Sequence, residues 1–323
     1  MLKNRKVKVL AVAAAVAMAA TTLGTSQANA AGAKITFIQG VAGDAFYITM
    51  NCGVQEAAKA AGATVTVTGG AKWDATVQKP VLDSVIAASP DAILIAPNDK
   101  TALQKPIEAA IAAGIKVVLV DTTIDSPAAA VAEIASDNYG GGKAAFNAVK
   151  QLKPAGGKVL VVSTSPGVSS VDARVLGFAD AANKDKKYNY IGVQYSNNEP
   201  AVAQRIITAA LAKNKDIVAV FATNLFSAQG VAAGIKQAGK AGKVAVVGFD
   251  AGSDQVKALK AGTVQALIAQ QPATIGSKGV EAAVKAIGGG TVSPKAVKTG
   301  FTILTKKNID TAAGKKAQYR DAC

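Results

Sequence analysis

The residues best suited to chemistry near the start of the chain are a carboxylate and two adjacent aromatic rings, Asp44, Phe46 and Tyr47. A carboxylate accepts hydrogen bonds from hydroxyl groups, and the face of an aromatic ring packs against apolar C–H groups. A small ligand with C–H faces and hydroxyl edges, such as a sugar, matches this set. The alternative is that the two rings only pack against the start of a helix, because aromatic side chains usually belong to a core.

These three residues lie between a predicted strand and a predicted helix. Residues 34–38 form a short apolar, β-branched run of the kind that is buried on both faces of a parallel sheet. Residues 48–61 carry alanines and charges at helical spacing and end at Gly62, a residue suited to terminate a helix. In an open α/β sheet, the loop after such a strand lies at the edge where ligands bind.

The first thirty residues have the pattern of a secretory signal peptide. Four cations within residues 3–8 precede an apolar run over residues 9–20 and a small-x-small cleavage site at residues 28–30. We therefore expect residues 1–30 to be removed and the mature chain to begin near Ala31, with its formal charge reduced from +15 to +11. The apolar run is too short to span a bilayer, and so is every later one.

The chain of 323 residues contains no histidine and two cysteines, Cys52 and Cys323. This composition excludes Ser-His-Asp and Cys-His catalysis and a metal site rich in His or Cys. Outside the cytoplasm the two cysteines form one disulfide or remain free, and we favour the disulfide because a cysteine at the chain end otherwise exposes a reactive thiol. The lysines are scattered and 5% of residues are aromatic, so nucleic-acid binding is not expected.

Strands alternate with helices along the mature chain, which predicts an α/β fold with parallel sheets covered on both faces. The strands expected after residues 34–38 span residues 63–68, 92–95, 116–120, 131–135, 157–162, 190–193, 217–221, 243–247, 263–272 and 301–304. The helices expected after residues 48–61 span residues 75–88, 101–113 and 274–287, and others are centred near Arg174, Ala209, Ala232 and Ala258.

Two segments of the first half recur in the second half. Residues 90–98 resemble residues 215–224, and residues 113–121 resemble residues 241–250. In both halves an Asn and an Asp follow successive strands, so each half directs polar groups from the same edge of its sheet. Two similar lobes whose polar edges face each other enclose a cleft. Crossings between such lobes are expected at residues 137–138, at Gln270 and at residues 299–300.

Three other motifs carry weaker signals. Tyr139-Gly-Gly-Gly-Lys143 lacks the spacing of a phosphate-binding loop and fits a helix start after a crossing. Residues 163–170 are rich in hydroxyl groups, but no base is present to activate a serine. Asp44, Asp121 and Asp250 lack the calcium-loop pattern, and nothing in the sequence indicates the raised pKa that a glycoside hydrolase needs.

The chain resembles the ribose-binding-protein branch of the type I periplasmic sugar-binding proteins, the ligand receptors of ABC importers. The similarity extends over the mature chain to about Leu304. It rests on segments that match the family's cleft loop, first hinge, binding arginine and sugar-binding strand ends: residues 44–47, 118–121, 134–138, 174–178, 221–224, 247–250 and 268–272. The resemblance implies two Rossmann-like lobes joined by three hinge crossings.

The resemblance also implies ligand-binding roles for residues of both lobes. Asp121 and Asp250 would accept hydrogen bonds from sugar hydroxyls, and the planar guanidinium of Arg174 would donate two. Amides that donate and accept, together with rings that lie against the C–H faces of the sugar, complete the implied site: Asn224, Gln270, Phe46 and Tyr47.

Three positions depart from the family's pattern. Thr122 follows Asp121 where the family has Arg, Asn198 lies near the position of an aromatic that stacks on pentoses, and Asp44 replaces an Asn. These changes favour another pentose, a hexose, a furanose form or a sugar alcohol over ribose. Trp73 lies on the expected cleft edge, where it supplies a replacement aromatic wall or packs as a lid over the first lobe.

The sequence therefore predicts a monomeric, non-enzymatic periplasmic receptor without a cofactor. It is expected to close on a monosaccharide or sugar alcohol and to deliver it to an ABC permease of the inner membrane. The alternative is a sugar receptor that serves chemotaxis or signalling. We expect lobe 1 over residues 31–137 and 271–299, lobe 2 over residues 138–270 and 300–312, and a tail over residues 313–323 that returns towards lobe 1.

Overall fold

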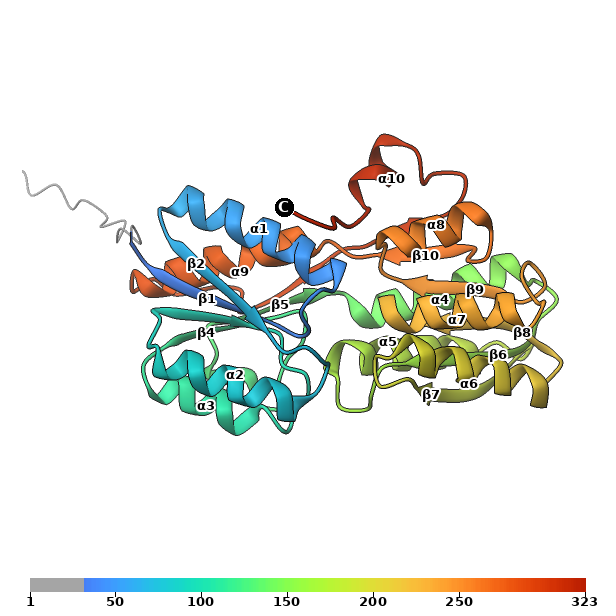
Figure 1. The fold of residues 1–323 in the computed structure, drawn as a ribbon, viewed down its shortest axis with the longest axis horizontal. Helices are drawn as coiled ribbons and strands as arrows, with labels where there is room; N and C mark the ends of the chain where they lie inside the picture. Colours follow the sequence, from blue (N-terminus) through green and yellow to red (C-terminus); the bar gives the residue numbers. More distant parts are fainter. Residues whose placement is uncertain (1–31) are drawn as a thin grey trace, which may run out of the picture.

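The computed structural model describes residues 32–323, in which two α/β lobes lie side by side along the long axis of the molecule (Figure 1). The signal peptide expected at residues 1–30 falls outside the described residues. Within residues 32–323 each lobe contains one six-stranded sheet. Over that same stretch, no helix is both long and apolar enough to cross a membrane.

The sheet of lobe 1 is parallel throughout, with strand order β11-β5-β4-β3-β1-β2. Helices α1 and α9 pack together on one face, and α2 and α3 cover the other (Figure 1). The elements are β1 (Lys34–Gln39), α1 (Ala45–Ala61), β2 (Thr64–Gly69), α2 (Ala75–Ala87), β3 (Ala92–Ile95), α3 (Gln104–Ala112), β4 (Lys116–Val120), the short 3₁₀ helix η1 (Pro127–Ala129), β5 (Ala132–Ser136), α9 (Pro272–Ile287) and β11 (Ala296–Thr299).

The sheet of lobe 2 has the order β12-β10-β9-β8-β6-β7, and only β12 is antiparallel to its neighbour. Alternate residues of β6 pack into two clusters, one with α4 and α5 and the other with α6 and α7, as the alternation of side chains along a strand requires. The elements are α4 (Asn138–Leu152), β6 (Gly157–Ser163), α5 (Ser169–Asn183), β7 (Tyr188–Tyr195), α6 (Pro200–Lys213), β8 (Ile217–Ala222), α7 (Leu225–Gln237), β9 (Ala245–Phe249), α8 (Ser253–Ala261), β10 (Ala266–Ala269) and β12 (Thr302–Leu304).

The chain passes between the two sheets at three places: from β5 to α4, from β10 to α9 and from β11 to β12. These crossings are bonded to one another. The hydroxyl of Ser136 donates to Oε1 of Gln270 at 2.7 Å, and the N–H of Asp137 donates to the carbonyl of Thr299 at 2.9 Å. The three connections therefore form one narrow hinge region beside the cleft.

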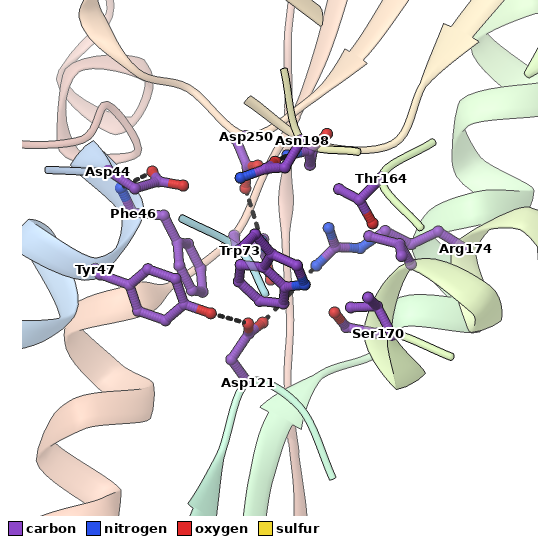
Figure 2. A pocket seen from close by; sticks show the side chains of 14 residues that line it. Asp44, Phe46, Tyr47, Trp73, Asp121, Thr164, Ser170, Arg174, Asn198 and Asp250 are labelled. Atoms are coloured by element: carbon purple, nitrogen blue, oxygen red, sulfur yellow. Dashed lines mark hydrogen bonds and ion pairs between the residues drawn. The ribbon is translucent and has the colours of Figure 1, made fainter. Parts of the chain in front are cut away.

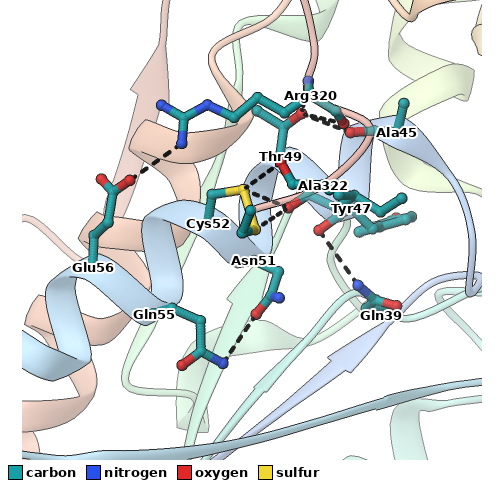
Figure 3. The surroundings of a disulfide bond; sticks show 12 residues. Gln39, Ala45, Tyr47, Thr49, Asn51, Cys52, Gln55, Glu56, Arg320 and Ala322 are labelled. Carbon is teal, nitrogen blue, oxygen red and sulfur yellow. Dashed lines mark hydrogen bonds and ion pairs between the residues drawn. A yellow bond between two sulfur atoms is a disulfide. The ribbon is translucent and has the colours of Figure 1, made fainter.

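A tail follows β12 and runs over lobe 2 through the short helix α10 (Ala312–Lys316) before it ends against lobe 1 (Figure 1). Cys323 forms a disulfide with Cys52 on α1, and the two Cα atoms are 5.3 Å apart (Figure 3). The structure thus contains the disulfide favoured by the sequence.

Helix α1 begins at Ala45, three residues before its predicted start. The carboxylate of Asp44 accepts a hydrogen bond from the N–H of Phe46 at 2.8 Å and so caps the helix. Phe46 and Tyr47 therefore lie on the first helical turn and not in a loop. Elsewhere β10 is shorter than predicted and β7 is longer, and β11 has no predicted counterpart because this short edge strand lacks an apolar run.

Candidate functional site

The cleft between the lobes holds a cavity with about 350 Å³ of empty space, counted out to its mouth. Figure 2 shows side chains of both lobes directed into it. The lining residues are Asp44, Phe46, Tyr47, Trp73 and Asp121 from lobe 1, and Thr164, Val168, Ser170, Val171, Arg174, Asn198, Asn224, Asp250 and Gln270 from lobe 2.

Aromatic side chains of lobe 1 form one wall of the cavity. Tyr47 and Trp73 stack with their ring centroids 6.2 Å apart, and Phe46 packs edge-on against Tyr47 at 5.1 Å. Nε1–H of Trp73 donates to the carbonyl of Asn98 at 3.2 Å, which fixes the indole at the cleft edge. The wall therefore offers fixed apolar surface to the C–H groups of a ligand.

Asp121 and Asp250 occupy equivalent places in the two lobes, directly after β4 and β9. Both have left-handed backbone conformations, with φ of 65° and 79°. Each N–H donates to a carbonyl of the neighbouring strand, of Ile134 and Ile268 respectively, at 2.9 Å. Asp adopts this conformation more readily than most residues because its short side chain can bond locally. The internal repeat thus places one carboxylate at the cleft edge of each sheet.

The carboxylate of Asp121 is bonded through only one of its oxygens. Its Oδ2 accepts a hydrogen bond from the hydroxyl of Tyr47 at 2.7 Å, whereas Oδ1 is buried without a partner. Nη2 of Arg174 lies 4.0 Å from that oxygen, on the opposite side of the cleft. Burial raises the pKa of Asp121 to about 6, against the lowering effects of Arg174 and the Tyr47 hydroxyl.

The guanidinium of Arg174 is held rigidly by lobe 2. Nε donates to Oδ1 of Asn138 at 2.9 Å, and Nη1 donates to the carbonyl of Thr223 at 2.8 Å. The group also lies over the ring of Phe249, 3.8 Å from its centroid. Nη2 alone is buried without a partner. One arm of a fixed fork is therefore free to donate to a ligand in the cavity.

Both oxygens of Asp250 accept hydrogen bonds from the protein. Oδ1 accepts from the side-chain amide of Gln270 at 2.6 Å and from the hydroxyl of Tyr319 at 3.0 Å. Oδ2 accepts from the N–H of Leu225, the first residue of α7, at 2.9 Å. Burial raises the pKa of Asp250, while Arg174 and these three hydrogen bonds oppose the rise.

Two asparagines make the neighbouring wall of lobe 2 polar. Nδ2 of Asn224 donates to Oδ1 of Asn198 at 2.6 Å. Oδ1 of Asn224 accepts from the N–H of Ser227 at 3.2 Å and caps α7. Asn198 has a φ of 60°, a conformation that Asn tolerates well, and its side chain reaches the cavity.

Three carboxylates share this cavity with a single guanidinium. Burial and the charges of Asp250 and Asp121 raise the pKa of Asp44 to about 7, against the bond from the N–H of Phe46. An anionic ligand would add a further negative charge in a poorly solvated space. Within residues 32–323 no group of three or more His, Cys, Asp or Glu side chains is arranged to hold a metal ion. The arrangement therefore suits a neutral ligand rich in hydroxyl groups.

The structure places one of the predicted site residues, Thr122, outside this cavity. Thr122 is buried, and its hydroxyl donates to the carbonyl of Pro97 at 2.8 Å. It lines a separate cavity on the hinge side. Because its hydroxyl donates to this backbone carbonyl, Thr122 stabilises the end of β4 and does not face the candidate site.

Four lining residues were missed in the sequence: Thr164, Val168, Ser170 and Val171. They belong to the hydroxyl-rich segment after β6 and to the start of α5. The hydroxyl of Thr164 is buried without a hydrogen-bond partner. Their position after a predicted strand was the available signal, since loops at the carboxyl edge of a parallel sheet bind ligands whether or not a serine is activated.

The two lobes touch each other at the mouth of the cavity. The N–H of Lys100 in lobe 1 donates to the carbonyl of Gly167 in lobe 2 at 3.0 Å. The N–H of Thr123 in lobe 1 donates to the hydroxyl of Ser169 in lobe 2 at 2.8 Å. These two bonds join the lobes beside the cavity.

Two lobes on three crossings, with a cavity between them lined by polar groups of both, have the architecture of ligand-binding proteins that close by hinge bending. The chain belongs to the periplasmic binding protein domain family, which it matches over residues 35–291. The ribose import binding protein of Salmonella typhimurium is 31% identical over 253 residues, which cover 78% of this chain and 83% of the relative.

Solved structures of solute-binding proteins from Agrobacterium vitis are also similar. An ABC transporter solute-binding protein bound with α-D-tagatopyranose is 39% identical, with a TM-score of 0.87 over 89% of this chain and 99% of the other. A second, with bound D-fucose, is 32% identical, with a TM-score of 0.84 over 88% of this chain and the whole of the other. This chain is therefore a member of the sugar-binding, ribose-binding-protein-like branch of the family.

Proposed function

We propose that this chain is the extracytoplasmic receptor of an ABC importer and binds a neutral monosaccharide or sugar alcohol between its lobes. The sugar is not transformed. The lobes close on it by hinge bending, and the closed form delivers it to the permease in the membrane. The family and the sugars bound by its similar solute-binding proteins support this proposal.

The observation that carries the proposal is a set of buried, unpaired polar groups that face one cavity from two lobes. Asp121 in lobe 1 contributes an acceptor, Arg174 in lobe 2 a donor, and Thr164 in lobe 2 a hydroxyl. Unpaired buried polar groups are unfavourable. A sugar supplies donors and acceptors to all three and places its C–H faces on the aromatic wall.

Six-carbon pyranoses come first among the candidates. The lobe 2 wall is polar at Asn198 and Thr164, so it offers hydrogen bonds rather than a second ring. The similar protein with 39% identity holds α-D-tagatopyranose, a six-carbon sugar. Pentoses remain candidate ligands because the family includes ribose import binding proteins.

The remaining parts of the proposal concern location and organisation. The protein reaches the periplasm through a cleaved signal peptide, acts there as a monomer and binds no nucleic acid. Residues 31–137 with 271–299 move as lobe 1, and residues 138–270 with 300–312 move as lobe 2. The tail at residues 313–323 returns to lobe 1 and is attached there by its disulfide.

A thermal-shift screen of the mature protein tests the proposal. The panel contains D-tagatose, D-fucose, D-allose, D-ribose, D-arabinose and D-sorbitol. A ligand that binds only the native state raises the unfolding midpoint, and titration calorimetry then gives its affinity. The sugar should be recovered unchanged after long incubation. A panel without any shift would contradict sugar binding, and chemical conversion of the sugar would contradict a pure receptor.

A further inference from the structure

The last residues of the chain lie beyond the part that matches the family, and they pass from lobe 2 to lobe 1. The N–H of Tyr319 donates to the carbonyl of Ala251 in lobe 2 at 3.0 Å. The N–H of the next residue, Arg320, donates to the hydroxyl of Thr49 in lobe 1 at 2.7 Å. The tail therefore changes lobes within one peptide unit and forms a fourth connection between them.

The end of this tail is attached to lobe 1 by a covalent bond and by an ion pair. Nη1 of Arg320 lies 3.2 Å from Oε1 of Glu56 (Figure 3), but both side chains are exposed, and such pairs stabilise little. The disulfide between Cys323 and Cys52 is therefore the durable attachment.

The side chain of Tyr319 is buried behind the ligand cavity. Its ring packs 5.9 Å from that of Phe46 in lobe 1. Its hydroxyl donates to Oδ1 of Asp250 at 3.0 Å and accepts from the N–H of Gln270 at 3.0 Å. Phe46, Asp250 and Gln270 all line the cavity, whereas Tyr319 does not. One tail residue thus contacts three site residues from two lobes.

We propose that Tyr319 is a positioning residue of the ligand site and that the disulfide of the tail keeps it in place, an inference that rests on the proposed sugar-binding function. A carboxylate has about four acceptor positions. Three of those of Asp250 already receive hydrogen bonds, from Gln270, Tyr319 and Leu225. The Tyr319 hydroxyl fixes the side chain so that its remaining acceptor capacity faces the ligand.

The length of the tail ties this role to the motion of the lobes. Cys323 lies four positions after Tyr319, and four extended residue steps span about 14 Å at most. Opening that keeps the disulfide and the Tyr319 hydrogen bonds cannot separate Cys323 from Tyr319 by more than this distance. Wider opening withdraws Tyr319 from Asp250, so the site is complete only when the lobes are near each other.

Calorimetric titration of two tyrosine variants tests the role of the hydroxyl, with D-tagatose as the probe and the other panel sugars in parallel. Tyr319→Phe keeps the ring and removes the hydroxyl, and we expect roughly tenfold weaker binding because Asp250 is then no longer held in position for the ligand. The matched control is Tyr188→Phe, since Tyr188 is similarly buried and donates to the carbonyl of Lys153, away from the cavity. The control should bind within twofold of wild type.

A second pair of variants tests the role of the disulfide. Replacing Cys52 and Cys323 together by Ser should weaken binding severalfold in the wild-type background. The same replacement should add less than twofold in the Tyr319→Phe background, because two changes that act through one contact are not additive. Equal effects in both backgrounds would show that the disulfide does not act through Tyr319.

The pH profile of binding separates positioning from a structural role. Removing the Tyr319 hydroxyl should raise the pKa of Asp250 and move the loss of binding in acid to higher pH. The other groups that face Asp250, namely Arg174, Asp44 and Asp121, are the same in both proteins. A structural role would lower the unfolding midpoint without moving this profile.

The outcomes distinguish this inference from the proposed function. If wild type binds none of the panel sugars, the proposed function and the inference both fail. If wild type binds and Tyr319→Phe binds within twofold of it, with an unchanged pH profile, the inference alone is overturned.

Discussion

Asp121 of lobe 1 and Arg174 of lobe 2 face each other across the cleft, and their atoms Oδ1 and Nη2 are 4.0 Å apart without any hydrogen-bond partner. This separation is too long for a hydrogen bond. A buried donor or acceptor left unpaired is unfavourable by about 1–3 kcal/mol. A ligand hydroxyl both donates and accepts, so one hydroxyl between the two atoms satisfies both and links the lobes.

The substitution Asp121→Asn tests this relationship. It keeps the side-chain shape and an acceptor for Tyr47, but it removes the charge that receives the ligand hydroxyl. We expect at least tenfold weaker sugar binding by calorimetry, since a hydrogen bond to a charged group contributes about 1.5–3 kcal/mol. The unliganded protein should unfold at the same or a higher temperature, because burial disfavours the charged form of Asp121 and raises its pKa despite Arg174.

The matched control for this variant is Asp83→Asn. Asp83 is an exposed carboxylate on α2 that pairs with Lys79 at 2.6 Å and does not line the cavity. The Asp83→Asn variant should bind sugar with the same affinity as wild type. Unchanged affinity in Asp121→Asn would show that this carboxylate does not contact the ligand.

The substitution Thr164→Val tests the buried hydroxyl of lobe 2. Valine has nearly the same shape, so the unliganded protein should gain about 1 kcal/mol of stability when an unpaired buried hydroxyl is lost. Sugar binding should weaken about fivefold, because the ligand loses one neutral hydrogen bond of about 1 kcal/mol. Thr208→Val, which changes a half-buried hydroxyl bonded to the carbonyl of Gln204 on α6, is the control. Tighter binding by Thr164→Val would contradict the assignment.

The fold was largely predictable because two kinds of signal agree along the chain. Apolar runs alternate with helical patterns, and residues 113–121 resemble residues 241–250. The structure gives Asp121 and Asp250, at the ends of these segments, the same backbone conformation and the same bond to the next strand. A repeat of this kind indicates tertiary structure because similar segments form the same strand and the same turn in each lobe.

The details of the site were less predictable because they depend on which atoms find partners. Thr122 follows the site residue Asp121 in the sequence, yet its hydroxyl donates a hydrogen bond to the carbonyl of Pro97. Thr164 belongs to a hydroxyl-rich segment without an activating base, and the sequence does not indicate which of its hydroxyls faces the cavity. Tyr319 is separated from Asp250 by 69 positions, and although the expected disulfide returns the tail towards lobe 1, no local pattern indicates that Tyr319 contacts Asp250.

The high pKa of Asp44 makes the stability of the unliganded protein depend on pH. Its ordinary value is 3.8 and its value in the folded protein is about 7, so the folded state holds more protons than the unfolded state between these limits. Stability should therefore fall as the pH rises from about 4 to about 7, by at most about 1.4 kcal/mol per pH unit for one group.

The substitution Asp44→Asn isolates this contribution. Asn is an equally good helix cap, so the bond from the N–H of Phe46 is retained while the charge is lost. Denaturant unfolding at pH 5 and pH 8 should show a smaller difference in the variant than in wild type. A residual slope of the same sign should remain from Asp121, whose pKa is also raised. Identical differences would mean that Asp44 titrates normally.

The same carboxylates should make the site discriminate against acidic sugars, and more strongly at high pH. At pH 8 Asp44 and Asp121 are both ionised, because their pKa values are about 7 and about 6. A sugar acid, with a pKa near 3.5, is ionised as well and is repelled in a poorly solvated cavity. At pH 5 both side chains are largely protonated, so most of this repulsion disappears. At each pH the effect is the ratio of two affinities, that of the neutral sugar and that of its corresponding acid.

Calorimetry with both compounds at pH 5 and pH 8 measures this ratio. We expect the neutral sugar to bind more tightly at both pH values, with the larger ratio of affinities at pH 8. A ratio that does not change with pH would assign the discrimination to shape, and tighter binding of the acid would remove these aspartates from the ligand site.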